Sequence, residues 1–217
     1  MRTLVIDVGG SNLKILREGE EKRRKVKSGP HLSAEVMVQS VHDVCSDWDW
    51  ERVSIGYPSP VVGGRPLLNP SNLGGGWVGF DYQAAFGCPV RILNDAAMQA
   101  LGSYHGGRML FLGLGTGLGS AMIEHGHLEP LELGHMPFRE DCFEHYTGKA
   151  GLKRQGFEAW RDTVFEVVGQ FVDAIDPDYV VLGGGNVKKL DELPDRCERG
   201  SNFNAFVGGF RMWEQDA

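Results

Sequence analysis

Two segments of this chain share one pattern, in which an apolar strand, a turn of small residues and a second apolar strand follow one another. The clearer example is Leu110–Glu124, where FLGLGTGLGSAMIE follows the leucine, and a weaker version, LVIDVGGSNLKIL, spans Leu4–Leu16. Glycine turns expose backbone N–H groups, which bind phosphate. Two such hairpins predict two similar α/β lobes, each directing a glycine turn at a shared cleft, and they indicate an enzyme that handles phosphate.

Composition narrows the classes of protein that remain. The chain has 217 residues, 31 of them glycine, and a net charge of −7. The glycines sit at discrete turns, and the acidic balance disfavours nucleic-acid binding, which usually needs a basic face. The four cysteines are scattered without CxxC spacing, so no zinc knuckle or redox motif is visible. No apolar run reaches the roughly 18 residues of a membrane span and no signal peptide is evident, so we expect a cytoplasmic protein without a membrane partner.

Apolar patterning predicts a series of strands and helices. Strands are expected at Arg2–Val8, Asn12–Arg17, Lys22–Lys27, Val53–Gly56, Val90–Leu93 and Asp178–Leu182, and helices at Ser33–Ser46, Asp81–Phe86, Ala96–Tyr104, Gln155–Ile175 and Phe203–Trp213. The basic run in Lys22–Lys27 is typical of a solvated edge strand, and an anion site is the alternative.

Long segments without a clear pattern are expected to be loops. Tyr57–Phe80 is rich in proline and glycine, and a loop of this length usually carries function. His127–Phe138 is expected to be a second loop. We place the boundary between the lobes so that residues 1–107 form an N-terminal lobe with a sugar-binding loop. Residues 108–217 form a C-terminal lobe whose last helix is able to pack back on the first.

The first glycine turn carries a carboxylate at the end of its strand. Such a turn can hold phosphoryl oxygens by its N–H groups while the Asp faces a metal ion and a lysine adds positive charge. An ordinary hairpin with an Asp at its rim is the alternative. The candidate donor-binding residues here are Asp7, Gly9, Gly10, Ser11 and Lys14.

Two further glycine segments lie in the second half of the chain. One offers N–H groups and a hydroxyl between paired strands, and the other ends a strand where a flat adenine ring could lie against the backbone. Ordinary turns are the alternatives, since hairpins and strand ends often carry glycine. The candidate residues are Gly115, Thr116 and Gly117 in the first segment and Gly183, Gly184 and Gly185 in the second.

Asn94 and Asp95 directly follow an apolar strand, in the sequence LNDAAM. Ligands of α/β folds gather at the carboxyl ends of strands, so Asp95 could accept the proton of a hydroxyl that attacks phosphorus, and Asn94 could bind another hydroxyl of the same substrate. The alternative is that Asp95 only caps the helix that follows.

The sequence ELGH places Glu132 and His135 three residues apart, so both could face one small polyol. A metal site is not favoured, because no further ligands follow at a useful spacing. In the long loop, Asn72 and Trp77 could complete a sugar-binding wall, although a tryptophan there is more often part of the core. The alternative for Glu132 and His135 is a pair of unrelated surface residues.

Taken together, these motifs resemble the ROK family of sugar kinases, within the actin-like ATPase superfamily. The resemblance rests on DVGGSNLK, GYPS, NLGGGW, LNDA, GLGTGLGSA, ELGH and LGGG, whose order and spacing agree over nearly the whole chain. GLGSAMIEHGHLEPLELGHM and GGGNVKKLDELP are most similar to the polyphosphate glucokinase branch. Ser59 stands where the family usually has glycine, and the family's zinc-binding cysteine cluster is absent.

The resemblance implies an α/β fold of two actin-like, ribonuclease H-like lobes around a central cleft. It implies phosphoryl transfer to a hexose, with Asp95 as the base, Mg²⁺ near Asp7, and backbone cradles for ATP or polyphosphate. We therefore expect a glucokinase that uses no zinc and forms a homodimer. The alternatives are an ATP-dependent kinase of another hexose or amino sugar, and a non-catalytic sugar sensor. Because the first strand starts at Arg2, we expect no DNA-binding segment before it.

Overall fold

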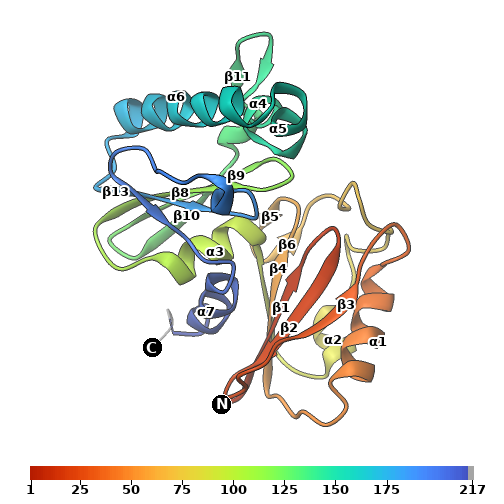
Figure 1. Cartoon of the computed structure of the whole chain (residues 1–217). Helices are drawn as coiled ribbons and strands as arrows, with labels where there is room; N and C mark the ends of the chain where they lie inside the picture. The colour runs from red at the N-terminus through yellow and green to blue at the C-terminus, as the bar shows by residue number, and fades with distance from the viewer. Residues whose placement is uncertain (215–217) are drawn as a thin grey trace. The chain divides into compact units, whose positions relative to one another are not determined.

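The computed structural model describes residues 1–214 and divides into two compact units (Figure 1). The first comprises residues 1–98 together with the chain from Ala205 onward, and the second is Gln99–Asn204. Residues 215–217, which end the expected C-terminal lobe, lie outside the described residues. Helix α3 (Asp95–Ser103) begins in the first unit and ends in the second.

The first unit is built on a five-stranded sheet in the order β3-β2-β1-β4-β7. The pairs β1–β2 and β2–β3 are antiparallel, whereas β1–β4 and β4–β7 are parallel. Every residue of β1 is buried, as expected for a strand that is covered on both faces. The strands are β1 (Thr3–Val8), β2 (Asn12–Arg17), β3 (Arg24–Lys27), β4 (Arg52–Tyr57) and β7 (Val90–Asn94).

Alternate residues of β1 serve two different layers, because successive side chains of a strand point to opposite faces. Leu4, Ile6 and Val8 share one core cluster with residues of α1 (Ala34–Val44) and α2 (Tyr82–Phe86). On the opposite face, α7 (Asn204–Arg211) lies against β1 and β4. Asp7 belongs to this second face, two residues beyond Val5.

Two helix starts of the first unit agree with the capping residues in the sequence. The Ser33 hydroxyl accepts a hydrogen bond from the Val36 amide at 3.2 Å, so Ser33 caps the start of α1. The Asp81 carboxylate accepts one from the Ala84 amide at 2.9 Å at the start of α2. Each cap satisfies an amide that has no partner within its helix.

The second unit repeats the sheet of the first, in the order β10-β9-β8-β13-β14. Again two antiparallel pairs on one side are followed by two parallel pairs on the other. This repetition confirms the prediction of two similar α/β lobes. The strands are β8 (Arg108–Leu114), β9 (Leu118–Glu124), β10 (His127–Leu131), β13 (Tyr179–Gly183) and β14 (Cys197–Arg199).

Three helices pack against this sheet and complete the core of the second unit, which includes the fully buried Trp160. They are α4 (Phe143–Thr147), α5 (Lys149–Gln155) and α6 (Phe157–Ile175). Gly156 separates α5 from α6 because its φ of +78° interrupts the helical path. The predicted helix Gln155–Ile175 is therefore wrong by two residues at its start. None of the helices within residues 1–214 combines the length and the apolar character needed to cross a membrane.

The predicted loop His127–Phe138 is wrong in part. It contains β10, the 3₁₀ helix η1 (Leu133–His135) and β11 (Pro137–Phe138), which pairs with β12 (Asp141–Cys142). Strand β10 lies at the edge of its sheet and buries none of its residues fully, so its sequence lacks the apolar run that marks a central strand.

Smaller differences concern other irregular segments. Within the long loop, β5 (Val61–Val62) and β6 (Arg65–Pro66) form a short hairpin. The edge strand β3 starts at Arg24 rather than at Lys22, and η2 (Val187–Lys189) follows β13. These elements are too short to leave a periodic pattern.

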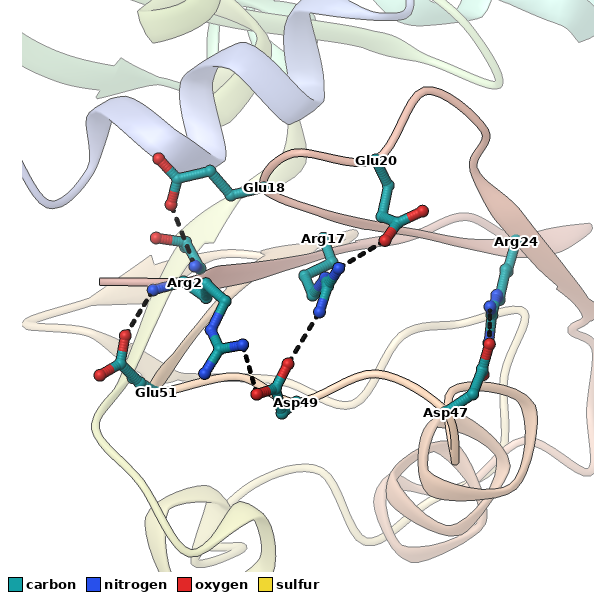
Figure 2. A network of polar contacts seen from close by, with 9 residues as sticks. Arg2, Arg17, Glu18, Glu20, Arg24, Asp47, Asp49 and Glu51 are labelled. Atoms are coloured by element: carbon teal, nitrogen blue, oxygen red, sulfur yellow. Dashed lines mark hydrogen bonds and ion pairs between the residues drawn. The ribbon is translucent and has the colours of Figure 1, made fainter.

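Figure 2 shows a network of charged residues in the first unit, and two of its arginines also lie close to the Trp48 ring. The Arg24 guanidinium lies 3.7 Å from the centre of the Trp48 ring and also pairs with Asp47, with Nη2 2.7 Å from Oδ2. Arg17 bridges Asp49 at 2.8 Å and Glu20 at 2.5 Å. The network therefore occupies Arg17 and Arg24 in contacts that hold β2 and β3 to the segment after α1.

The close approach of α7 to β1 predicts the effect of one added methyl group. A Cβ on Gly209 would lie 2.3 Å from Val5 Cγ1, and the β-branched valine has little freedom to yield. We expect Gly209→Ala to lower the free energy of unfolding by about 1–3 kcal/mol, measured by urea denaturation. The matched control is Gly169→Ala in α6, where a Cβ meets open space and should stabilise by about 0.5–1 kcal/mol. Wild-type stability of Gly209→Ala would contradict this packing.

Candidate active site

Asp7 and Lys14 form a partly buried ion pair at the end of the first hairpin. The two residues lie opposite each other in the antiparallel register of β1 and β2. Lys14 Nζ lies 2.6 Å from Asp7 Oδ2, and the side chains are 26% and 8% exposed. The ammonium group thus offsets the cost of burying the Asp7 carboxylate.

Asp95 lies close to this pair because β4, the strand between β1 and β7, has a glycine at position 56. Asp7 is paired with Gly56 in the register of β1 and β4. A Cβ on Gly56 would lie 3.7 Å from Asp95 Cα and 2.2 Å from Met98 Cε, so the start of α3 occupies the space above Gly56. The structure therefore brings together Asp7 and Asp95, which are far apart in the sequence.

The environment of Asp95 raises its pKa to about 7. The largest cause is burial, which disfavours the charged form, and the next is the nearby negative charge of Asp7. A hydrogen bond from the Ala96 amide at 2.8 Å and the positive charge of Lys14 act in the opposite direction. A carboxylate with this pKa is suited to accept a proton near neutral pH.

Asn94, rather than Asp95, provides the main cap of α3. Its Oδ1 accepts hydrogen bonds from the amides of Ala96 at 2.9 Å and Ala97 at 3.3 Å. The carboxylate of Asp95 accepts a bond from Ala96 alone. The capping explanation for Asp95 therefore loses its main support, while the carbonyl oxygen of Asn94 is occupied by the helix.

The long loop places Asn72 near the first glycine turn. A Cβ on Gly10 would lie 4.0 Å from Asn72 Cβ, and Asn72 is exposed. Trp77, in contrast, is fully buried, and its indole N–H donates to the Gly74 carbonyl at 2.6 Å. Trp77 is thus a core residue, as the alternative interpretation held, and it anchors the loop that carries Asn72.

Each glycine turn uses one of its N–H groups internally. The Gly9 amide donates to the Asn12 carbonyl at 3.2 Å, and the Gly115 amide is shared between the carbonyls of Gly113 and Gly117. Within residues 1–214, no such acceptor is found for the amides of Gly10 and Thr116. The amides of Gly10 and Thr116 are therefore left for an anion, whereas those of Gly9 and Gly115 are not.

The two glycine segments of the second unit lie against each other. Gly184 has a φ of +82°, and a Cβ there would lie 2.5 Å from the Leu114 backbone. Asn186, which sequence reasoning missed, donates from Nδ2 to the Gly115 carbonyl at 3.0 Å. The structure therefore brings the predicted donor-binding segments Gly115–Gly117 and Gly183–Gly185 together within this unit.

His135 lies between two carboxylates of the second unit. Its Nδ1 is 3.5 Å from Glu132 Oε2, and its Nε2 is 3.7 Å from Glu144 Oε1. Sequence reasoning missed Glu144, which lies in the first turn of α4; a Cβ on Gly117 would lie 2.0 Å from its Oε2. Polar groups of this kind can bind several hydroxyls of one sugar.

The predicted site residues thus fall into two sets, one in each unit. The first unit holds Asp7, Gly9, Gly10, Ser11, Lys14, Asn72, Asn94 and Asp95, and the second holds Gly115, Thr116, Gly117, Glu132, His135, Gly183, Gly184 and Gly185.

The residues of the first unit fit the chemistry of Mg²⁺. This ion usually takes only one or two protein carboxylates and completes its shell with water and substrate phosphates. Lys14 binds Asp7 Oδ2, which leaves Oδ1 as a ligand. In the part of the chain from 1 to 214, no group of three or more His, Cys, Asp or Glu side chains is arranged to hold a metal by itself.

Comparisons with known proteins agree with this arrangement. The model of the ROK family matches residues 3–155. A polyphosphate glucokinase of Mycobacterium tuberculosis is 27% identical over 209 residues, covering 86% of this chain and 78% of that protein. The crystal structure of an inorganic polyphosphate/ATP-glucomannokinase from Arthrobacter superposes with a TM-score of 0.84 at 22% identity, covering 100% of this chain and 99% of that one. A ROK family glucokinase from Streptomyces griseus, in complex with glucose and AMPPNP, gives 0.74 at 18% identity, with coverage of 99% and 100%.

The fold is therefore that of the two-lobed sugar kinases, with a sheet in each lobe. The chain belongs to the ROK family. The relatives described above are sugar phosphotransferases by name.

The contacts of Asp95 predict how its titration responds to its neighbours. Removing the charge of Asp7 removes a group that raises the pKa of Asp95 and frees Lys14, which lowers it. We expect Asp7→Asn to move the midpoint of the Asp95 carboxyl from near pH 7 to a lower pH, followed by NMR with ¹³C-labelled aspartate. The control Asp191→Asn, on the exposed surface of the second unit, should leave it unchanged. An upward or absent shift in Asp7→Asn would contradict the proximity of the two carboxylates.

Proposed function

We propose that this protein is a glucokinase that transfers a phosphoryl group from polyphosphate, ATP or both to the 6-hydroxyl of glucose. The observation that carries the proposal is Asp95, a carboxylate with a pKa of about 7 beside the Asp7–Lys14 pair, at the end of a sheet strand. Asp95 is not required to cap α3, because Asn94 does so. Its position and its pKa suit a general base.

In the proposed reaction, Asp95 accepts the proton of the sugar hydroxyl as that hydroxyl attacks the terminal phosphorus of the donor. The bond from phosphorus to the leaving oxygen of the donor breaks, and the shortened donor leaves. Phosphoryl transfer depends mostly on positioning and on stabilising charge. In the first unit, Lys14 and the free amide of Gly10 can supply positive charge and a hydrogen bond to phosphoryl oxygens, and in the second the free amide of Thr116 can donate a hydrogen bond of the same kind. When bound, Mg²⁺ would neutralise part of the charge on the phosphates.

Each unit offers its own candidate groups for the sugar. In the first unit, Asn72 and the Nδ2 group of Asn94 can bind hydroxyls, and in the second, Glu132 and His135 can do so together with Glu144. The cluster around His135 supports this role, because an imidazole between two carboxylates offers donors and acceptors at fixed spacing. The turns Gly115–Gly117 and Gly183–Gly185 bind the donor.

Polyphosphate as a donor is supported by the names of the relatives and by the basic segments Lys22–Lys27, Lys149–Arg154 and Lys188–Lys189. A polyanion attracted by exposed lysines binds more weakly as salt rises. The expected homodimer and the cytoplasmic location also stay predictions, the first of which sedimentation velocity would test.

A single coupled assay separates this proposal from its alternatives. We expect phosphorylation of glucose with polyphosphate or ATP, and with polyphosphate a rate at subsaturating donor that falls as salt rises. Mannose and N-acetylmannosamine are the comparison acceptors. Preference for one of them would make the protein a kinase of another sugar. Sugar binding without turnover of any donor would make it a sensor and would contradict the proposed function.

The role of Asp95 is tested by Asp95→Asn, which keeps the shape of the side chain but cannot accept the proton. We expect kcat to fall by at least about 10²-fold, with little change in the affinity for glucose. Asp95→Asn should also be more stable than the wild type, by a margin that grows from about pH 4 to pH 7 and is constant above pH 7. The reason is that the wild-type carboxyl ionises near pH 3.8 in the unfolded chain but only near pH 7 in the folded protein. Unfolding curves at pH 5.5 and pH 8 would show a larger gain at pH 8. Near wild-type turnover would contradict the mechanism.

A further inference from the structure

The basic edge of the first sheet is divided by the alternation of strand β3. Arg24 and Val26 point to the face of α1. Val26 packs on the core there, and Arg24, which lies over the Trp48 ring, pairs with Asp47, a contact drawn in Figure 2. Lys25 and Lys27 therefore point to the opposite face. The sequence alone does not reveal this division, because Arg24, Lys25 and Lys27 belong to one basic segment.

The face that carries Lys25 and Lys27 is the face of the candidate active site. Lys25 is paired with Lys14 in the register of β2 and β3, and Lys14 is paired with Asp7 in the register of β1 and β2. Lys27 is paired with Asn12, one step nearer the glycine turn. Paired residues share a face of the sheet, so Lys14, Lys25 and Lys27 form a basic ladder that begins at Asp7.

Lys25 and Lys27, the two outer residues of this basic ladder, are free to bind a ligand. Lys25 and Lys27 are exposed, and within residues 1–214 neither makes an ion pair, whereas Arg17 and Arg24 of the same hairpin do. The end of β3 is also tied to the glycine turn, since the Ser28 amide donates to the Ser11 carbonyl at 3.2 Å and its hydroxyl donates to the Gly9 carbonyl at 2.5 Å.

The strand order indicates on which side of the reacting phosphoryl group the basic ladder lies. In the order β3-β2-β1-β4-β7, Asp95 follows β7, Asp7 lies one residue before the end of β1, and the lysines lie on β2 and β3. In phosphoryl transfer the attacking and leaving oxygens are roughly in line through phosphorus. If the attacked hydroxyl lies at Asp95 and the phosphoryl group at the turn after Asp7, the leaving chain points toward β2 and β3.

We propose that Lys25 and Lys27, with Lys14, bind the phosphates of a polyphosphate donor that lie beyond the transferred group. This inference rests on the proposed kinase function and deepens it by assigning the leaving part of the donor to a surface. Strands lie about 4.8 Å apart, so the ladder extends about 10 Å from Asp7, beyond the first leaving phosphate. A short donor does not reach Lys25 and Lys27, whereas a long polyphosphate does.

The test compares two double variants that remove the same charge from the same segment. Lys25→Gln/Lys27→Gln removes the outer rungs, and the matched control Lys22→Gln/Arg23→Gln removes two exposed charges just before β3. Binding of long-chain sodium polyphosphate and of tripolyphosphate is measured by calorimetry at low and high salt, without sugar. Equal thermal unfolding of both variants shows that the fold is intact.

We expect the ladder variant to raise the Kd of long-chain polyphosphate about tenfold, to flatten its salt dependence and to leave tripolyphosphate nearly unchanged. The control removes the same charge from the same basic segment but leaves the ladder intact, so we expect it to raise this Kd much less. In turnover, KM for long-chain polyphosphate rises and KM for glucose does not. Equal losses in both variants, or a wild-type protein that does not bind long-chain polyphosphate, would overturn the ladder. Phosphorylation of glucose with ATP in that protein would show that the proposed kinase itself stands.

Discussion

The electrostatic conflict between Asp7 and Asp95 is the constraint on which the rest of the first unit depends. Two carboxylates near each other raise the pKa of at least one of them, and a buried charge needs a partner. Lys14 supplies the partner for Asp7, Gly56 leaves room for α3, and Asn94 relieves Asp95 of the capping role. Three strands and one helix start are thus arranged around a carboxylate that titrates near neutral pH.

The same topology serves a different chemistry in the second unit. Asp7 is the penultimate residue of β1 and is paired with Gly56, whereas Gly113 holds the equivalent position in β8 and is paired with Gly183. Where the first unit places an ionisable side chain, the second therefore has two paired glycines without side chains. Its titratable groups lie instead on η1 and α4, after the sheet edge. In the proposed mechanism, the repeated fold thus places the general base in the first unit and recognition of the donor by backbone groups in the second.

Much of this fold could be predicted from the sequence, because central strands such as β1, β8 and β13 are continuous apolar runs. The edge strand β10 could not, since half-exposed strands carry no such signal. The two glycine turns and Asp95 were recognisable because each directly follows an apolar strand. Glu144 was not, because it comes from a five-residue helix and reaches the cluster only through tertiary packing against Gly117.

The sequence could not predict which amides of the two glycine turns form internal hydrogen bonds, for a related reason. A glycine turn signals exposed amides, but which amide is exposed depends on the register of the hairpin, and here Gly9 and Gly115 use theirs internally.

The edge strand β3 shows how register decides function where composition cannot. Lysines on an edge strand discourage pairing with another sheet, and this role needs only that they be charged and exposed. A one-residue shift of β3 would preserve that protection but would turn Lys25 and Lys27 toward α1 and place Arg24 and Val26 on the face of Asp7. Arg24 would then lose its contacts with Trp48 and Asp47, and Val26 its place in the core. The packing of Trp48 and Val26 therefore fixes which lysines face the candidate active site.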